Sequence, residues 1–253
     1  MRFMAEKLVV ENLKIIYLEN NKFLMAIKNL SFAVKENEFL CLLGPTGCGK
    51  TTVLNAIAGF IKPAKGRILL DGKNIEEPTG KIGIVFQNYA LFPWKTVQEN
   101  ISMGLKINGF SKEDIKRLAK RYLQLIGLTK YSGYYPKELS GGMQQRVAIA
   151  RVLANNPELI LMDEPFASLD AQTRIKLQEQ LLKIWQLRKK TIIFVTHDID
   201  EAILLSDRIL VMTKMPGKIK KEIKNNLPRP RYYKQTTDKK YIKLKRDILR
   251  LLE

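Results

Sequence analysis

The sequence predicts an α/β fold whose central sheet is mainly parallel. Short apolar runs alternate with segments of helical periodicity, which is the pattern of strands connected by crossover helices. Several runs are continuous stretches of Ile, Leu and Val, as expected for strands that are covered on both faces. The 253 residues are 45% hydrophobic and 27% charged, so the chain has globular composition and enough length for one large or two small domains.

Six strands and three helices are expected along the core of the chain. The strands are expected at residues 39–43, 68–70, 82–86, 159–162, 191–195 and 208–212. The helices are expected at residues 50–58, 143–154 and 171–187. Residues 5–40 show a different pattern, with short apolar runs at 8–10 and 30–34, and are expected to form an antiparallel β subdomain.

The middle of the chain, residues 97–140, has helical character. Ser111 is followed three residues later by the carboxylate of Asp114, a spacing that is typical of a helix start. One face of the following helix would carry Leu118, Tyr122, Leu125 and Ile126. The sequence therefore predicts an α-helical subdomain, at about residues 97–155, inserted in the α/β core.

The C-terminal residues 218–253 differ from the rest in charge. They contain 13 basic and 4 acidic residues, a net charge of +9, and we treat them as a basic extension of a domain formed by residues 1–217. Apolar residues at helical spacing predict an amphipathic helix at its end; they are Tyr241, Leu244, Ile248, Leu251 and Leu252. This helix would dock on the protein's own surface or, as the alternative, contact a membrane or a partner.

The whole chain is basic, with 44 Lys and Arg against 25 Asp and Glu, or +19. Such a charge attracts nucleic acid, anionic lipid or nucleotide without selecting among them, and a solvated lysine-rich surface is an equally good interpretation. No apolar run approaches the roughly 20 residues that a membrane-spanning helix needs. The charged N-terminus does not resemble a signal peptide, and two cysteines exclude a disulfide-built fold and suit a reducing cytosol.

A glycine-rich loop fits the Walker A pattern G-x-x-x-x-G-K-[ST] at residues 44–51, between an expected strand and an expected helix. Glycines let backbone N–H groups converge on phosphate oxygens, and the helix N-terminus adds partial positive charge. Lys50 should reach the β- and γ-phosphates, and the Thr51 hydroxyl should ligate Mg²⁺. The residues expected to bind nucleotide are Gly44, Pro45, Thr46, Gly47, Cys48, Gly49, Lys50, Thr51 and Thr52. The sequence thus predicts a P-loop NTPase core.

Two adjacent carboxylates, Asp163 and Glu164, end the apolar run that begins at Leu159. Ionised carboxylates resist desolvation, and a divalent cation would offset that cost. In P-loop enzymes the Asp at this position holds Mg²⁺ through water. Glu164 would then lie near the γ-phosphate and polarise an attacking water. Alone, the pair would also suit a strand that simply ends in solvent.

With the segment Leu139-Ser140-Gly141-Gly142-Met143, the chain resembles the ATP-binding subunit of an ABC transporter over residues 5–217. The matching motifs follow the family's order; they are residues 44–51, Gln87, residues 139–143, residues 159–164, residues 168–170 and His197. The resemblance implies that two such subunits pair head to tail, with each ATP between the phosphate loop of one copy and the signature segment of the other. The family usually has Gln where Met143 stands, so we expect modest effects on affinity and retained turnover.

The resemblance also implies roles for single residues. Ser140, Gly141 and Gly142 would contact the γ-phosphate across the interface, where they form a second anion-binding helix start. Further positions carry implied roles: Gln87 as a Mg²⁺ ligand that reports nucleotide state, His197 as the residue that orients Glu164 and water, Asp170 as a bridge across the dimer, and Tyr17 as the aromatic that stacks on adenine. Phe3 and Phe23 are weaker rivals of Tyr17 for the adenine contact.

Within the family, residues 87–94, 163–174 and 227–231 are similar to the nitrate/sulfonate/taurine group of importers. Membership would imply docking on a separate integral membrane permease, an external substrate-binding protein that selects the cargo, and a peripheral position at the cytoplasmic face of the cell membrane. The alternatives are an exporter or lipid-extraction subunit, which differs only in docking residues, and a soluble ATPase acting on nucleic acid. Neither a second nucleotide domain nor a long coiled coil is present, so no specific nucleic acid is expected.

Overall fold

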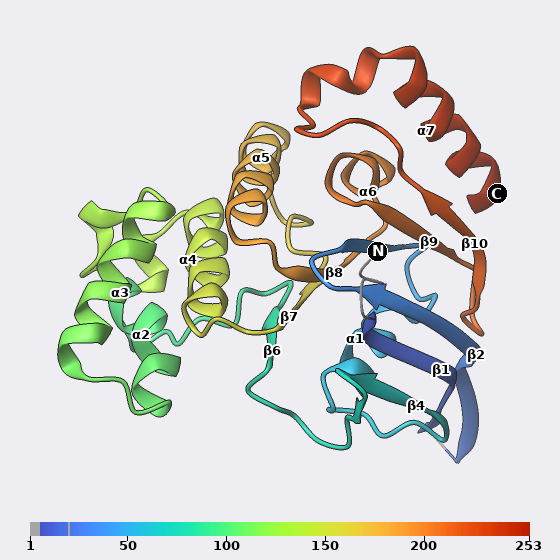
Figure 1. Ribbon diagram of the computed structural model, residues 1–253, viewed down its shortest axis with the longest axis horizontal. Coiled ribbons are helices and arrows are strands. Elements are labelled where there is room, and N and C mark those ends of the chain that lie inside the picture. The colour runs from blue at the N-terminus through green and yellow to red at the C-terminus, as the bar shows by residue number, and fades with distance from the viewer. Residues whose placement is uncertain (1–5, 20) are drawn as a thin grey trace, which may run out of the picture.

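Two β-sheets and the helices around them make up the part of the chain that the computed structural model describes, residues 6–19 and 21–253 (Figure 1). The main sheet has the order β10-β9-β3-β8-β7-β6. Its strands are β3 (Phe39–Leu43), β6 (Ile82–Val85), β7 (Leu159–Asp163), β8 (Thr191–Thr196), β9 (Arg208–Met212) and β10 (Ile219–Lys224). All neighbouring pairs are parallel except β9 and β10, which confirms the predicted α/β class.

Alternate residues of the central strands face two separate hydrophobic clusters, because successive side chains of a strand point to opposite faces. Strand β3 shows this directly. Phe39, Cys41 and Leu43 pack in one cluster with residues of the later helices. Leu40 and Leu42 pack in the other cluster with the second sheet and the helix after the phosphate loop. The continuous apolar runs of the sequence are therefore explained by burial on both faces.

The second sheet is antiparallel and has the order β2-β1-β4-β5. Its strands are β1 (Glu6–Glu19), β2 (Lys22–Lys35), β4 (Lys65–Leu70) and β5 (Lys73–Asn74). The antiparallel subdomain is confirmed, but the prediction of short strands was wrong, because β1 and β2 each have 14 residues. Bulges at Asn12 and Asn29, both at positive φ, interrupt the alternation of apolar and polar residues that would have revealed the full strands. The run expected at 68–70 belongs to this sheet and pairs with β1.

The helices lie on both sides of the main sheet. Their bounds are α1 (Lys50–Ile57), α2 (Val97–Ile107), α3 (Lys112–Leu125), α4 (Gly141–Ala154), α5 (Ala171–Arg188), α6 (Ile199–Leu205) and α7 (Lys239–Leu252), with short 3₁₀ turns at Thr129–Tyr131, Pro136–Glu138 and Tyr233–Thr237. Helix α1 lies on the side of the antiparallel sheet, whereas α4, α5 and α6 pack in the cluster on the opposite face (Figure 1). Among the described helices, none combines the length and apolar character needed to cross a bilayer.

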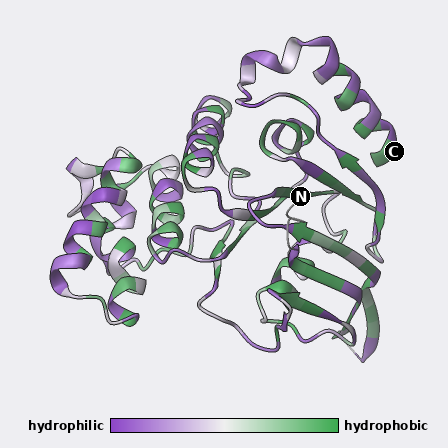
Figure 2. Ribbon diagram, viewed as in Figure 1, coloured by the Kyte–Doolittle hydropathy of each residue, from purple (hydrophilic) through white to green (hydrophobic). Residues whose placement is uncertain are grey.

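Helices α2, α3 and α4 pack against one another at the far end of the molecule from α7 (Figure 1). Local signals fix their starts: Thr96 and Glu99 form a capping box on α2, and the Ser111 hydroxyl accepts a hydrogen bond from the Asp114 N–H at the start of α3. The helix start predicted at Ser111 is therefore confirmed. Figure 2 shows hydrophobic residues concentrated in the strands, and hydrophilic residues on much of α3 and α7.

The C-terminal residues pack on the body of the protein. Strand β10 extends the main sheet beyond residue 217, and the buried guanidinium of Arg231 donates to the carbonyls of Ser206 and Leu227. Helix α7 buries Tyr241 and Ile248 in the main core, so the tail docks on the protein's own surface.

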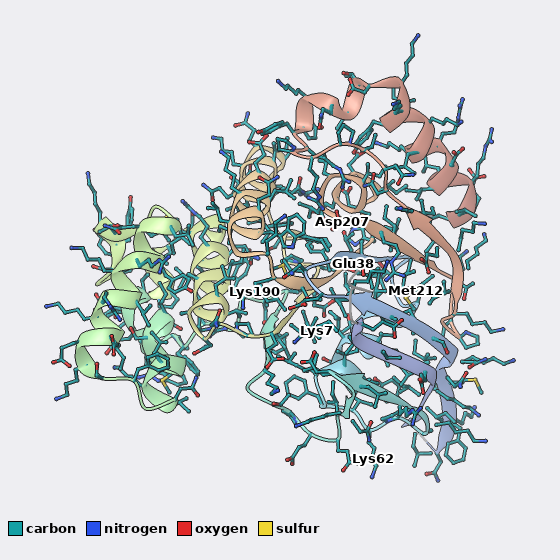
Figure 3. The ribbon with its side chains drawn as sticks, viewed as in Figure 1. Lys7, Glu38, Lys62, Lys190, Asp207 and Met212 are labelled. Atoms are coloured by element: carbon teal, nitrogen blue, oxygen red, sulfur yellow. The ribbon has the colours of Figure 1, made fainter. Side chains whose placement is uncertain are left out.

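Asp207, labelled with Glu38 in Figure 3, accepts from the Phe39 N–H and joins the starts of β9 and β3. The division at residues 217 and 218 stays a prediction.

Candidate active site

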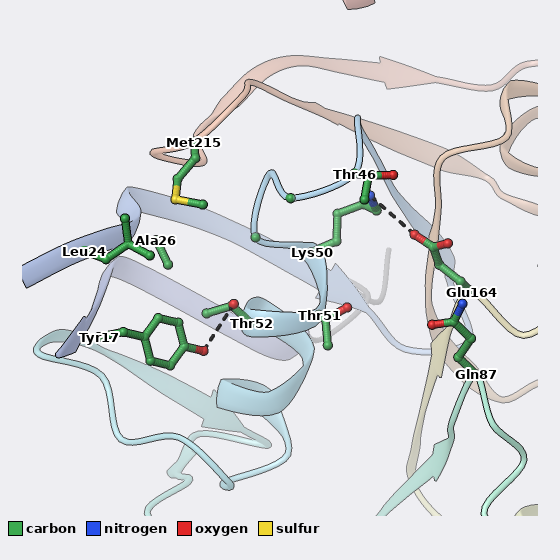
Figure 4. Close-up of a pocket in the computed structure, with 12 residues that line it drawn as sticks. Tyr17, Leu24, Ala26, Thr46, Lys50, Thr51, Thr52, Gln87, Glu164 and Met215 are labelled. Carbon is green, nitrogen blue, oxygen red and sulfur yellow. Dashed lines mark hydrogen bonds and ion pairs between the residues drawn. The ribbon is translucent and has the colours of Figure 1, made fainter. Parts of the chain in front are cut away.

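The glycine-rich loop connects β3 to α1 and forms one wall of a pocket of about 410 Å³ (Figure 4). The pocket is lined by Tyr17, Leu24, Ala26, Thr46, Gly47, Gly49, Lys50, Thr51, Thr52, Gln87, Glu164 and Met215. The Lys50 ammonium donates to the carbonyls of Gly44 at 2.8 Å and Pro45 at 3.0 Å, and lies 3.5 Å from Glu164 Oε1. A buried cation, the backbone of two glycines and a helix N-terminus thus converge on one cavity, which is a site for phosphate groups.

Backbone geometry explains the glycines of the loop. Gly47 and Gly49 have φ of 78° and 97°, a region that is costly for other residues. At Gly49 a Cβ atom would also lie 2.7 Å from Ile27 Cδ1 of strand β2. Cys48 is buried behind the loop, and burial raises the pKa of its thiol. Gly44, Pro45 and Cys48 thus shape the loop from behind, whereas the other predicted loop residues line the pocket.

The metal-binding residues predicted from the sequence meet at one end of the pocket. The Thr51 hydroxyl donates to Asp163 Oδ1 at 3.0 Å, and Gln87 lines the pocket beside Glu164 (Figure 4). Burial raises the pKa of Asp163, so a positive charge that binds here would favour its ionised form. A hydroxyl, a carboxylate and an amide supply the oxygen ligands that Mg²⁺ prefers, so the residues present fit this ion.

Glu164 lies between two nitrogen-bearing side chains. Its Oε2 is 2.8 Å from His197 Nδ1, and its Oε1 faces the Lys50 ammonium. The backbone places it there: the Glu164 N–H donates to the Val195 carbonyl of β8, and the residue has φ of 41°. A carboxylate held by a neighbouring strand and contacted by an imidazole can orient and polarise a water next to the bound phosphate.

Tyr17 marks the other end of the pocket and donates to Thr52 Oγ1 at 3.2 Å. Met215, in the turn between β9 and β10, and Leu24 line the pocket with it, so an aromatic and two apolar side chains gather at this end (Figure 4). No motif in the sequence pointed to Met215 or Leu24, because a single apolar residue in a turn or at a strand end is common. Phe23 is 82% exposed and does not line this pocket, and Phe3 lies outside the described residues.

The signature segment is elsewhere. Ser140 caps helix α4, and its hydroxyl accepts from the Met143 N–H. At Gly142 a Cβ atom would lie 2.5 Å from Thr173 Cγ2 of α5, so any other residue there would require the Thr173 side chain to move. Asp170 caps α5 by accepting from the Thr173 N–H, and this hydrogen bond lowers the pKa of its carboxyl. The described residues that line the pocket include none from the signature segment and not Asp170.

Comparison with known proteins agrees with this geometry. The family model described as "ABC transporter" matches residues 27–167. An uncharacterised ABC transporter ATP-binding protein of Methanocaldococcus jannaschii is 50% identical over 99% of this chain and 92% of its own length. The aliphatic sulfonates import ATP-binding protein SsuB of Bacillus cereus is 44% identical over 94% of this chain and 92% of its own.

Solved structures give the same result. A bacterial ABC transporter cassette solved as a dimer has a TM-score of 0.78 and 35% identity, covering 87% of this chain and all of the other. An ATP-binding cassette solved as a dimer in a post-hydrolysis state with ADP and Pi has a TM-score of 0.77 and 34% identity, with the same coverage. Both the phosphate-binding pocket and these likenesses lead to one conclusion: the chain belongs to the ABC transporter family, as an ATP-binding subunit that hydrolyses ATP.

Proposed function

We propose that two copies of this chain pair head to tail and hydrolyse Mg²⁺-bound ATP at the two interfaces between them. The observation that carries this proposal is the separation of two phosphate-binding elements within one chain. The loop at Lys50 lines a pocket with Glu164, whereas the helix start at Ser140 is exposed and lies outside the pocket. A second copy would bring its own Ser140, Gly141 and Gly142 to the γ-phosphate, and its Asp170 close to the nucleotide.

Within one copy, the ion would be held by Thr51 and Gln87, which line the pocket, and by Asp163, which accepts from the Thr51 hydroxyl. A bound Mg²⁺ neutralises charge on the β- and γ-phosphates. Lys50 binds the same phosphates as a fixed cation, and the loop N–H groups hold them in place. These residues bind and orient the triphosphate.

The chemical step depends on Glu164 and His197. Glu164 accepts the hydrogen bond of the attacking water and aligns it with the γ-phosphorus. The His197 imidazole contacts Glu164 and would also reach the γ-phosphate, so it would fix the direction in which the carboxylate faces. Positioning of the water and stabilisation of charge are the main contributions that a protein makes to phosphoryl transfer.

A membrane permease would dock in an apolar hollow next to Gln87. This hollow of about 540 Å³ lies between β6, α2 and α4, and Phe86, Phe92, Met103 and Ile107 line it. Ile107 is 73% exposed, although isoleucine is normally buried. The residues of the hollow continue into the segment of Gln87, so a docked permease helix would sense the nucleotide site. The chain would then be a peripheral subunit at the cytoplasmic face of the membrane.

The sulfonate importers that resemble this chain, with 44–49% identity, support a role in the import of a nitrate-, sulfonate- or taurine-type anion. In such a system an external binding protein would select the cargo, and this chain would supply the energy of ATP hydrolysis. An exporter or lipid-extraction subunit is the alternative. Uptake of labelled sulfonate into vesicles that contain the chain and its permease, with ATP inside, would separate the two.

Glu164→Gln tests the central proposal. The amide keeps the size of the side chain but cannot act as a carboxylate toward water, so hydrolysis should fall by about 100-fold or more while ATP still binds. Size-exclusion chromatography with light scattering should show a dimer with ATP and Mg²⁺. The same protein with ADP, or with ATP and EDTA, should be monomeric and provides the control. A monomer at saturating ATP and Mg²⁺ would contradict the paired arrangement.

A further inference from the structure

A buried carboxylate lies directly behind the Glu164–His197 pair. Glu201 belongs to the first turn of α6, which begins two residues after His197, and only 4% of the residue is exposed. No pattern in the sequence singles it out, because acidic residues are common in the first turn of a helix. Its burial is unusual, since Glu is rarely buried without partners.

The contacts of Glu201 reach both chain neighbours of His197. On one side, the Thr196 hydroxyl donates to Glu201 Oε2 at 2.6 Å. On the other, Asp198 accepts from the Glu201 backbone N–H at 3.1 Å, and the Asp198 N–H donates to the Thr196 hydroxyl at 3.0 Å. Thr196, Asp198 and Glu201 therefore form a closed hydrogen-bonded ring, from which the His197 side chain projects.

Helix α5 holds Glu201 from the opposite direction. Gln178 donates to Glu201 Oε1 at 3.1 Å, and Arg174 lies 3.5 Å from Asp198 Oδ2. A small polar cavity of about 40 Å³ is lined by Glu201 and Arg174 together with Glu164 and His197. The carboxylate thus connects α5, β8 and α6 at the point where the catalytic pair is presented.

His197 needs such support. Its side chain is 52% exposed, and the contact to Glu164 is the one hydrogen bond that the described residues offer its ring. Rotation about the side-chain bonds of an exposed residue takes picoseconds to nanoseconds, so the imidazole returns to Glu164 only if the backbone at His197 keeps the Cα–Cβ bond in the right place and direction. The hydrogen-bonded cycle of Thr196, Asp198 and Glu201 holds this backbone in place.

Burial of a carboxyl here is costly. Desolvation raises the pKa of Glu201 to about 7, with Asp198 adding to the shift and Arg174 and the two hydrogen bonds opposing it. The Cys41 thiol of β3 also lies in this environment. A buried polar group of this kind is often no better for stability than an apolar residue of similar size. A role in the site explains a carboxylate at this position better than packing does.

We propose that Glu201 is a positioning residue: its carboxylate binds Thr196 on one side of His197, its backbone N–H binds Asp198 on the other, and the carboxylate contact that Glu201→Ala removes is needed to hold the imidazole against Glu164. This inference rests on the proposed function in one respect: the effect on turnover requires that the Glu164–His197 contact serves hydrolysis. The geometric part does not depend on it. Glu201 itself contacts neither nucleotide nor water at the reacting phosphate.

The single histidine of the chain provides a direct measurement. In the full-length protein labelled with ¹⁵N-histidine, one imidazole gives all the signals, and its ring nitrogen shifts report the tautomer and the contact to Glu164. Glu201→Ala should shift and broaden these signals. Glu201→Gln, which can still bond Thr196 and Gln178, should keep them near the wild-type position. Thr196→Val removes the hydroxyl from the ring without changing its size and should behave as Glu201→Ala does.

Asn225→Ala is the matched control. Asn225 is also buried and binds α6, but at its other end, through the carbonyls of Ile203 and Ser206. Its loss should destabilise the protein and leave the histidine signals unchanged. Wild-type signals in both Glu201→Ala and Thr196→Val would overturn the proposal, as would an equal shift in Asn225→Ala. If Glu201→Ala does not fold, Thr196→Val decides.

Turnover gives the second readout, measured on the full chain at concentrations where ATP drives pairing. Glu201→Ala should lower kcat about tenfold and change KM for ATP less than about twofold, whereas Glu201→Gln should retain at least about half of kcat. A fall in kcat that Gln does not rescue would overturn the inference. His197→Ala distinguishes the proposed function from the inference about Glu201. Unchanged turnover in this variant would remove the role of His197 from the proposed function. The histidine signals of the Glu201 variants would still show whether Glu201 positions the imidazole.

Discussion

The pocket at Lys50 and the helix start at Ser140 are both proposed to bind phosphate, but they differ in how many elements of the chain surround them. The pocket at Lys50 is lined by residues of β1, β2 and α1 and of the segments after β6 and β7, and the charged groups of Lys50 and Glu164 contact one another. The signature helix start at Ser140 is equally well formed as a helix cap, but it faces outward. In the proposed arrangement, the pocket at Lys50 binds nucleotide within one copy, whereas the helix start at Ser140 contacts phosphate only when a second copy brings it.

The carboxyl groups of the two regions show the same difference. Burial raises the pKa of Asp163 beside the pocket and of Glu201 behind it. At the signature region, hydrogen bonds from the backbone at the start of α5 lower the pKa of the exposed Asp170. Beside the pocket, burial thus disfavours the charged form of Asp163, which a bound cation would favour, whereas the exposed Asp170 is stabilised in its charged form by the backbone.

Lys50→Ala should give the largest effect, because it removes the cation from the pocket that binds ATP within one copy. Charge-assisted hydrogen bonds contribute about 1.5–3 kcal/mol each, so loss of the ammonium should weaken ATP binding about 100-fold or more. Isothermal titration calorimetry on the monomeric chain would measure this. Lys62→Ala, an exposed lysine shortly after α1, should leave the affinity unchanged. Equal affinities of wild type and Lys50→Ala would contradict the assignment of the phosphate loop.

Glu201→Gln should change the pH dependence of stability. The pKa of this carboxyl is about 7 in the folded protein against 4.5 when it is free, so the folded state binds more protons between these values. The wild type therefore loses stability as pH rises from about 4.5 to 7, by at most about 3 kcal/mol. The amide does not titrate, so the free energy of unfolding of the variant should increase relative to that of the wild type as pH rises over this range. Urea unfolding at pH 5 and pH 8 would measure the gain, and a difference independent of pH would contradict a strained carboxyl.

Much of the fold could be predicted, because burial on both faces leaves a continuous apolar run. Strands β3 and β8 were recognised in this way. Strand β10 was not, because it is an edge strand whose lysines hide the pattern. The long strands β1 and β2 were seen only in part, since bulges at Asn12 and Asn29 change which face the following residues occupy.

The candidate site was predictable where chemistry depends on neighbours in the chain. The loop at Lys50 and the pair at Asp163 are local patterns, and the structure brings them together through the hydrogen bond from Thr51. Met215 and Glu201 were not predictable, because their positions depend on tertiary contacts between segments that are distant in sequence. A lone methionine or glutamate gives no sign of the pocket or ring to which it belongs.

Ser140→Ala should affect only the helix start of the signature segment. Loss of the cap should cost about 1 kcal/mol of stability and leave the ATP affinity of the monomer unchanged. In the Glu164→Gln background, the ATP concentration needed for dimerisation should rise about tenfold, since a hydrogen bond to a charged group is worth about 1.5 kcal/mol or more. Ser111→Ala removes the same kind of cap from α3 and is the control, with a similar loss of stability and no effect on pairing. A weaker monomer affinity in Ser140→Ala would show that the two elements are not independent.

Met143→Gln should give the smallest effect and tests how much the residue at position 143 contributes to ATP-driven pairing. The Met143 side chain is half-buried against the core of the helices, and Gln has nearly the same length and volume, so the fold should accept it. Within one copy the new amide has no nucleotide to contact, so the monomer affinity should not change. Across the dimer it gains at most one polar contact beside those of Ser140, and the ATP concentration for pairing should shift less than about threefold. Light scattering against ATP concentration would measure this, and a tenfold gain would mean that methionine weakens the closed dimer in this chain.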